Sequence, residues 1–318
     1  MKGRSLLRIL GGAAVAGVSL WLAFRNVAWD RALAGFRSIG IGATFVVLAV
    51  VAASVCMRAL VWRSFARRLG DAPYGLSLRC LLVGMVANNV LPARLGELAR
   101  SGLWAVRTGV GQGRSLGVLA AERSLDLTAL GVLALVVLPT APVSEGTRKA
   151  LGVGAAIGVV VAVAFVILAR IRWSGIGRAS RTLGGLAEGF ASLGRPRELA
   201  LPALLSAIVW LVSFAYMVTT LRAFGVDVPL RAAALLLLAT QLAVVLPSAP
   251  SFAGPYHLAV SLALTAYGVD RDRAAGFAIF NHLAWVLPTS IAGAVVLLRE
   301  GLGLGRLATL GDTLPTQK

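Results

Sequence analysis

The sequence predicts an all-α polytopic membrane protein. It is expected to form an inverted repeat with two broken or re-entrant helical hairpins, entering from opposite sides, plus about six full transmembrane helices. Hydrophobic residues make up 58% of the 318-residue chain and charged residues only 14%. Several apolar runs exceed 18 residues, which is long enough to span a bilayer. Two stretches that contain proline and glycine, residues 88–100 and 245–257, interrupt apolar regions in the two halves. Such a pair of interrupted segments indicates a transport site.

Each interrupted stretch follows an apolar arm of 16 residues, at 76–91 and 231–246. At 1.5 Å per residue such an arm reaches about 24 Å, whereas the hydrocarbon core is about 30 Å thick. Broken backbone at membrane depth is tolerated only where protein buries it or where it lines a wet cavity. We therefore expect both stretches to border one polar cavity. The expected breaks lie at Pro92, Pro247, Pro250 and Gly254.

The apolar runs and their polar boundaries define the remaining elements. The first run is followed by Phe24-Arg25-Asn26 rather than by a small-residue cleavage site, which favours a retained helix over a signal peptide. In chain order the expected helices are 6–24, 39–62, the first hairpin arms 76–91 and 96–106, then 115–138, 149–169 and 199–221, the second hairpin arms 231–246 and 256–267, and finally 274–298.

Arginine-rich segments set the expected orientation. Residues 63–79 and 170–197 carry clusters of arginine, which the positive-inside rule assigns to the cytoplasm. Both termini are then cytoplasmic and the protein lies in the inner (cytoplasmic) membrane, although three arginines in the loop at 25–37 fit this topology less well. Three full crossings separate the two hairpins, so the hairpins enter from opposite sides.

The expected organisation is a single transmembrane domain over residues 1–300, with a first half at about 1–145 and a second half at about 148–300. A cytoplasmic tail follows at 301–318. Within 170–197, apolar residues recur at helical spacing between arginines, which is typical of an amphipathic helix in the membrane interface. A plain connecting loop is the alternative.

Composition and motifs also argue against several classes of protein, namely nucleic-acid-binding proteins, metalloproteins and enzymes. The net charge of +18 lies mostly between apolar runs, and no nucleic-acid-binding motif accompanies it, so we expect no nucleic acid partner. Cys56 and Cys80 sit in or beside apolar runs without disulfide or metal spacing. No phosphate-binding loop, nucleophile elbow or zinc-protease motif occurs, so we expect no enzyme, cofactor or metal.

Charged residues at membrane depth mark the candidate site. Glu122, Arg123 and Asp126 lie inside an apolar helix, and such charges usually face a bundle interior or a cavity. Arginine binds phosphate through two parallel hydrogen bonds, and a helix start such as that at Gly96 offers free N–H groups. The residues expected to hold a lipid headgroup or phosphate are Asn88, Asn89, Arg94, Gly96, Arg100 and Arg123.

A second set is expected to carry protons or balance charge: Glu97, Glu122, Asp126, His257 and His282. Structural alternatives remain for both sets. The charges can form a self-neutralising cluster that fixes helix packing, the histidines can be satisfied core residues, and the asparagines can hydrogen-bond backbone within the hairpin.

The motifs together resemble a known family. Asn89-Val90-Leu91-Pro92-Ala93-Arg94-Leu95-Gly96-Glu97-x-x-Arg100, then Glu122-Arg123-x-x-Asp126, then Leu246-Pro247-x-x-Pro250-x-x-x-Gly254, is similar to the membrane region of the lysylphosphatidylglycerol synthases. The resemblance covers residues 5–300 and is to stand-alone members without the soluble synthase domain. It implies transport or lipid handling without the synthase chemistry. His257 stands where the family commonly has a glutamate, which leaves a different headgroup or proton coupling open.

The resulting hypothesis is a flippase-like lipid translocase that moves an anionic phospholipid or a lipid-linked headgroup across the bilayer. One alternative is a membrane-embedded enzyme or accessory subunit acting on a lipid-linked sugar. A small-solute secondary transporter is another. The expected partners are membrane lipids, anionic in character; a homodimer and a separate lipid-modifying enzyme are left open.

Overall fold

A computed structural model describes residues 2–91, 95–170, 185, 196–245 and 250–301. Within these ranges the protein is helical and contains no strand. The elements are α1 (Lys2–Phe24), α2 (Trp29–Ala34), η1 (Gly35–Ser38), α3 (Ile41–Ala66), α4 (Tyr74–Val90), α5 (Leu95–Thr108), α6 (Gln112–Val137), α7 (Glu145–Arg170), α9 (Pro196–Ala223), α10 (Leu230–Val245), η3 (Pro250–Phe252), α11 (Pro255–Thr265) and α12 (Arg271–Arg299).

Four of the described helices are long and apolar enough to cross a membrane: Ile41–Ala66, Glu145–Ala164, Glu198–Ala223 and Arg271–Arg299. The sequence predicted about six full transmembrane helices, and α1 and α6 were among them. The described apolar part of α1, Gly11–Phe24, is shorter than the four helices above. Helix α6 has the length, at 26 residues, but it carries the three charges of the candidate site. The protein is therefore a multi-pass membrane protein.

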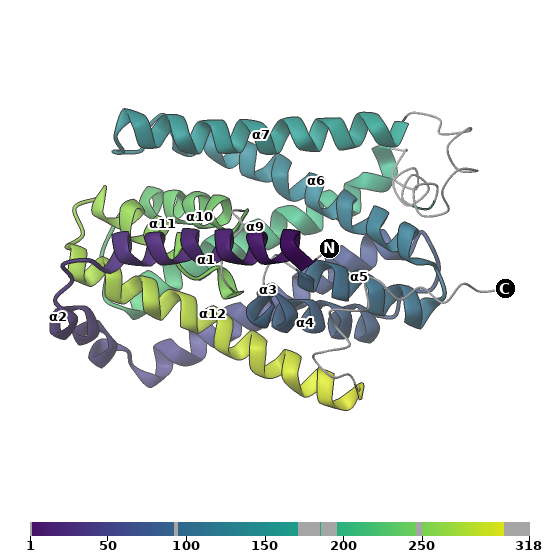
Figure 1. Cartoon of the computed structure of the whole chain (residues 1–318), viewed down its shortest axis with the longest axis horizontal. Coiled ribbons are helices and arrows are strands. Elements are labelled where there is room, and N and C mark those ends of the chain that lie inside the picture. The colour runs from purple at the N-terminus through teal and green to yellow at the C-terminus, as the bar shows by residue number, and fades with distance from the viewer. Residues whose placement is uncertain (1, 92–94, 171–184, 186–195, 246–249, 302–318) are drawn as a thin grey trace.

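The two expected hairpins appear as two pairs of short helices. Helices α4 and α5 pack against each other, as do α10 and α11, and α12 lies against both α4 and α11 (Figure 1). Each pair is interrupted close to the expected proline and glycine positions, after Val90 and after Val245. Figure 1 also shows α7 at one edge of the molecule, where it runs beside α6.

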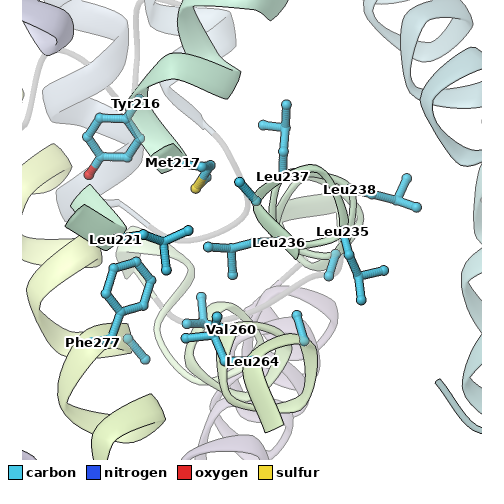
Figure 2. Close-up of a cluster of buried hydrophobic side chains, with 14 of the residues drawn as sticks. Tyr216, Met217, Leu221, Leu235, Leu236, Leu237, Leu238, Val260, Leu264 and Phe277 are labelled. Carbon is cyan, nitrogen blue, oxygen red and sulfur yellow. The ribbon is translucent and has the colours of Figure 1, made fainter. Parts of the chain in front are cut away.

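The middle of helix α10 is buried on all sides. Its four consecutive leucines, 235–238, are each at most 3% exposed. Because a helix turns about 100° per residue, four in a row point in four directions, and Figure 2 shows them on different sides of α10. Leu236 faces Leu221 of α9 and Val260 of α11. A helix that is apolar all round belongs in a protein interior, so α10 forms the centre of the second half.

Helix ends are fixed by local signals. Asp270 caps α12 by accepting hydrogen bonds from the backbone N–H groups of Asp272 and Arg273. Glu300, at the other end of α12, binds Arg79 of α4 at 3.0 Å and also binds Arg107 of α5. The short helix α2, in a stretch expected to be loop, packs against α12. The predicted amphipathic segment 170–197 lies almost entirely outside the described residues.

Candidate functional site

A polar cavity of about 400 Å³ lies at the junction of the two halves. Its walls come from α3, α4, α5 and α6 on one side and from α9, α10, η3, α11 and α12 on the other. Its charged lining residues, which we call the charged cluster, are Arg58, Glu97, Arg100, Glu122, Arg123 and Asp126. Its aromatic lining residues, which we call the aromatic group, are Trp210, Tyr216, Phe252, Tyr256, His282 and Trp285.

Two glycines bring α4 and α5 close enough to present the charged cluster. A Cβ on Gly96 would lie 2.0 Å from the carbonyl oxygen of Gly84, and a Cβ on Gly84 would lie 2.9 Å from the Cβ of Arg100. The backbone N–H of Gly96 donates to the side-chain oxygen of Asn88 at 2.9 Å. Gly96 and Asn88 therefore allow α4 and α5 to pack closely. The backbone N–H of Gly96 already donates to Asn88 and is not available for a ligand.

Arg100 is held by two carboxylates and an aromatic ring, although its Nε has no hydrogen-bond partner. Its Nη2 lies 3.1 Å from a carboxylate oxygen of Glu122 and 3.1 Å from one of Glu97. Its guanidinium carbon stands 4.4 Å from the ring centroid of Trp62, a cation–π contact. Because the Arg100 side chain is only 2% exposed, it is part of the scaffold. Arg100 does line the cavity, and its assignment as a phosphate-binding residue stays a prediction.

Arg123 is also ion-paired but remains partly open. Its Nη2 donates to Glu122 at 2.9 Å and its Nη1 lies 3.0 Å from Asp126. Glu97 is more distant, at 3.9 Å. The Arg123 side chain is 32% exposed, and the residue lines the cavity. Arg123 thus balances two acids and still faces the space where a ligand would sit.

Arg58 of α3 is the residue that sequence reasoning missed. Its Nη2 donates one hydrogen bond, to Ser213 Oγ of α9 at 3.3 Å. Within the described residues its Nε has no hydrogen-bond partner and no carboxylate forms an ion pair with it. The charged groups around it include Asp126, Arg123, Glu122 and Arg100. Arg58 lies eight residues, about 12 Å of helical rise, from the end of α3. Nε is without a hydrogen-bond partner in Arg58, Arg100 and Arg123 alike, but Arg58 is the one of these three described arginines that has no described carboxylate within ion-pair distance.

The charged cluster is formally neutral. It holds three cations and three anions at membrane depth, but the described ion pairs of the three acids are with Arg100 and Arg123, and none of the three lies within ion-pair distance of Arg58. Such charges are tolerated when they pair or face a wet cavity.

A sequence model of the lysylphosphatidylglycerol synthase transmembrane (TM) region matches residues 9–293. The chain belongs to this family. The match covers nearly the whole membrane part of the chain and includes every residue of the charged cluster. No curated protein sequence matches at a significant level.

In this family member, two polar residues of α12 contact the tyrosines of the aromatic group. The side chain of Asn281 is fully buried; it accepts from Tyr256 Oη and donates to Thr220 Oγ1 at 2.7 Å. Tyr216 Oη donates to the Asn281 carbonyl at 2.5 Å. His282 contacts the Ser251 carbonyl at 2.7 Å and stacks on Tyr256, with ring centroids 4.8 Å apart. Asn281 thus holds α9, α11 and α12 together behind the cavity wall.

His257 does not line the cavity. It is 7% exposed, accepts from the backbone N–H of Gly254 at 3.4 Å, and packs against Phe24 of α1. Its ring also contacts that of His282, at 4.8 Å between centroids. His257 is therefore a buried packing residue, and its predicted role in charge coupling has no direct geometric basis. Gly254 itself has φ +96°, and a Cβ there would lie 2.5 Å from the Ala16 carbonyl oxygen.

The structure brings together most of the site residues that the sequence predicted. Nine of them line the cavity: Asn88, Asn89, Gly96, Glu97, Arg100, Glu122, Arg123, Asp126 and His282. Asn89 joins the two halves, since it donates to Ser290 Oγ at 2.9 Å and its carbonyl accepts from Ser251. Pro250 begins η3. Pro92, Arg94 and Pro247 lie outside the described residues. In the described ranges no group of three His, Cys, Asp or Glu side chains could hold a metal ion.

Proposed function

We propose that this protein is a lipid translocase that moves an anionic phospholipid or a lipid-linked phosphate headgroup through the polar cavity. The observation that carries the proposal is Arg58, an arginine at membrane depth whose charge no described carboxylate pairs. Burying an unpaired cation costs free energy, and an anionic ligand offsets that cost. A phosphate bound there gains charge-assisted hydrogen bonds from the guanidinium fork.

The supporting geometry extends beyond Arg58. Arg123, 32% exposed, adds a second cation on the cavity wall. Asn88, Asn89 and His282 add polar groups that can contact a headgroup. Family membership supports lipid handling in general, since the family is a membrane region of enzymes of lipid synthesis.

We also propose that the cavity opens alternately to the two sides of the membrane, as such transport requires. The order α4–α5–α6 in the first half is matched by α10–α11–α12 in the second, and both triplets line the cavity. In this arrangement α4–α5 and α10–α11 are re-entrant hairpins that enter from opposite sides, the two halves rock about the cavity, and both termini are cytoplasmic.

Catalysis on a lipid-linked sugar fits the geometry less well. A glycosyl-transfer or hydrolysis site requires carboxylates free to act on substrate. Here Glu122 is bound by both Arg100 and Arg123, and Glu97 is bound by Arg100. Mass spectrometry of lipids incubated with the purified protein separates the two functions, because only an enzyme yields a new covalent species.

The direct test uses liposomes that contain unlabelled phosphatidylglycerol. External periodate oxidises the headgroup diol only in the outer leaflet, so translocation raises the oxidised fraction from the outer leaflet's share towards completion. Losing a charge-assisted hydrogen bond costs about 1.5–3 kcal/mol, so we expect Arg58→Gln to slow exchange roughly tenfold or more. Arg222→Gln, at an exposed position of α9, serves as the matched control. Equal rates in wild type and Arg58→Gln would contradict the proposal.

A further inference from the structure

A second, apolar cavity adjoins the polar one. It measures about 690 Å³ and lies between α7 on one side and α10 and α11 on the other, with α6 at its base. Among its described lining residues only Ser19 and Thr147 have polar side chains. We call this cavity the apolar groove.

The groove and the polar cavity share walls. Leu127, Leu130 and Val245 line both of them. Leu127 directly follows Asp126 of the charged cluster, so the chemistry of the wall changes from charged to apolar within one residue. A molecule that occupies both spaces must therefore be polar at one end and apolar at the other.

Helix α7 is arranged to leave the groove open. It packs along α6 and touches α10 only lightly, and Figure 1 shows it at the edge of the molecule. Its groove side presents small residues, Ala150, Gly154 and Gly158. A Cβ on Gly154 would meet only Leu242 of α10, at 3.4 Å, which is ordinary contact. Gly154 therefore leaves space between α7 and α10, whereas a Cβ on Gly158 would lie 3.2 Å from Leu127 of α6, so Gly158 serves the close packing of α7 on α6.

We infer that the apolar groove holds a hydrocarbon chain of the same lipid whose headgroup occupies the polar cavity. This inference rests on the proposed function and adds that the chain is bound by protein during translocation. The dimensions agree. Along α7 the groove runs from Thr147 to Val161, about 21 Å of helical rise, and one leaflet's half of the hydrocarbon core is about 15 Å.

The direction of the groove also indicates in which leaflet the bound lipid lies. Leu127 and Val161 mark the end beside the charged cluster, whereas Val143 and Thr147 mark the end near the α6–α7 connection. A lipid with its headgroup in the polar cavity and its chain in the groove points its head away from that connection. This is the orientation of a lipid in the leaflet on the opposite side, which the arginine distribution assigns to the cytoplasm.

Photo-crosslinking tests the inference. The protein is placed in nanodiscs with phosphatidylglycerol that carries a diazirine at the end of one acyl chain, and labelled residues are mapped by peptide mass spectrometry. We expect labels on the groove side of α7 and on α10 and α11, and few on Val153 and Val160, which face outward on α7 with 57% and 66% exposure. Arg58→Gln should lower groove labelling by the factor by which it slows exchange.

A second experiment fills the groove with larger side chains. Gly154→Phe and, at an exposed position, Ala150→Phe should each reduce groove labelling and exchange, whereas Val160→Phe should change neither. Labels spread evenly over groove and outward faces, with exchange still dependent on Arg58, would overturn the inference and leave the proposed function standing. Groove labelling that ignores Arg58→Gln, in a protein without exchange, would overturn both, because the chain would then belong to a static bound lipid.

Discussion

Arg100 and Glu122 face each other across α5 and α6 with 3.1 Å between Nη2 and Oε2, and their side chains are only 2% and 4% exposed. Glu97 and the ring of Trp62 complete the enclosure of the guanidinium. An ion pair buried to this degree fixes the relative position of two helices. All three arginines line the cavity, but the 2% exposure of Arg100 leaves Arg58 and Arg123 as the arginines better placed to contact a ligand.

Because the pair is buried, we expect the double substitution to lower the free energy of unfolding by less than the two single substitutions together. Arg100→Met leaves Glu122 buried without this partner, and breaking such a pair typically costs about 3–5 kcal/mol of unfolding free energy. Arg100→Met combined with Glu122→Met should cost less than the sum of the two single changes, because neither charge is then stranded. Equilibrium unfolding in detergent micelles measures this coupling.

Arg31→Met is the control for that experiment. Arg31 is 79% exposed and lies 3.9 Å from Asp272, so its loss should cost less than about 1 kcal/mol. Additive effects of Arg100→Met and Glu122→Met would show that the pair does not couple α5 to α6.

Gly96→Ala should separate α4 from α5. The added Cβ would lie 2.0 Å from the Gly84 carbonyl oxygen and 2.5 Å from Asn88 Oδ1, so the backbones must move apart. Thermal unfolding should show a clear loss of stability, and anionic lipid binding should weaken with it because Glu97 and Arg100 shift. Gly75→Ala, in the first turn of α4, meets no atom within 4 Å and should leave both properties unchanged. A wild-type melting temperature for Gly96→Ala would show that the crossing is looser than described.

Asn281→Ala should destabilise the second half without removing a cavity charge. The change leaves the hydroxyl of Tyr256 without its acceptor, and a buried unsatisfied polar group costs about 1–3 kcal/mol. Unfolding in detergent should report this loss. Thr219→Val on α9 removes only hydrogen bonds to its own helix and should have a much smaller effect. Similar losses for the two variants would argue against a network centred on Asn281.

The helices could be predicted closely because apolar runs bounded by proline, glycine and arginine leave few choices. The predicted arms 76–91 and 231–246 became α4 (Tyr74–Val90) and α10 (Leu230–Val245). The charged cluster was also predictable in outline, since charges at membrane depth must meet one another or water.

The role of each charged residue could not be predicted, because it depends on which helices meet. The sequence shows Arg100 and Arg123 as equivalent candidates, yet Trp62 of α3 encloses only Arg100. Arg58 did carry a signal, as a lone arginine inside the apolar helix predicted at 39–62. That signal was overlooked because Arg58 lies close to the basic residues at 63–68, which mark the helix end.

The most direct test of the central claim is native mass spectrometry of the purified protein with its bound lipids. The account predicts that wild type retains an anionic lipid, that Arg58→Gln loses it while keeping the wild-type melting temperature, and that Arg222→Gln retains it. Retention of the same lipid in equal amount by Arg58→Gln would contradict the claim that this cavity binds a phosphate headgroup through Arg58.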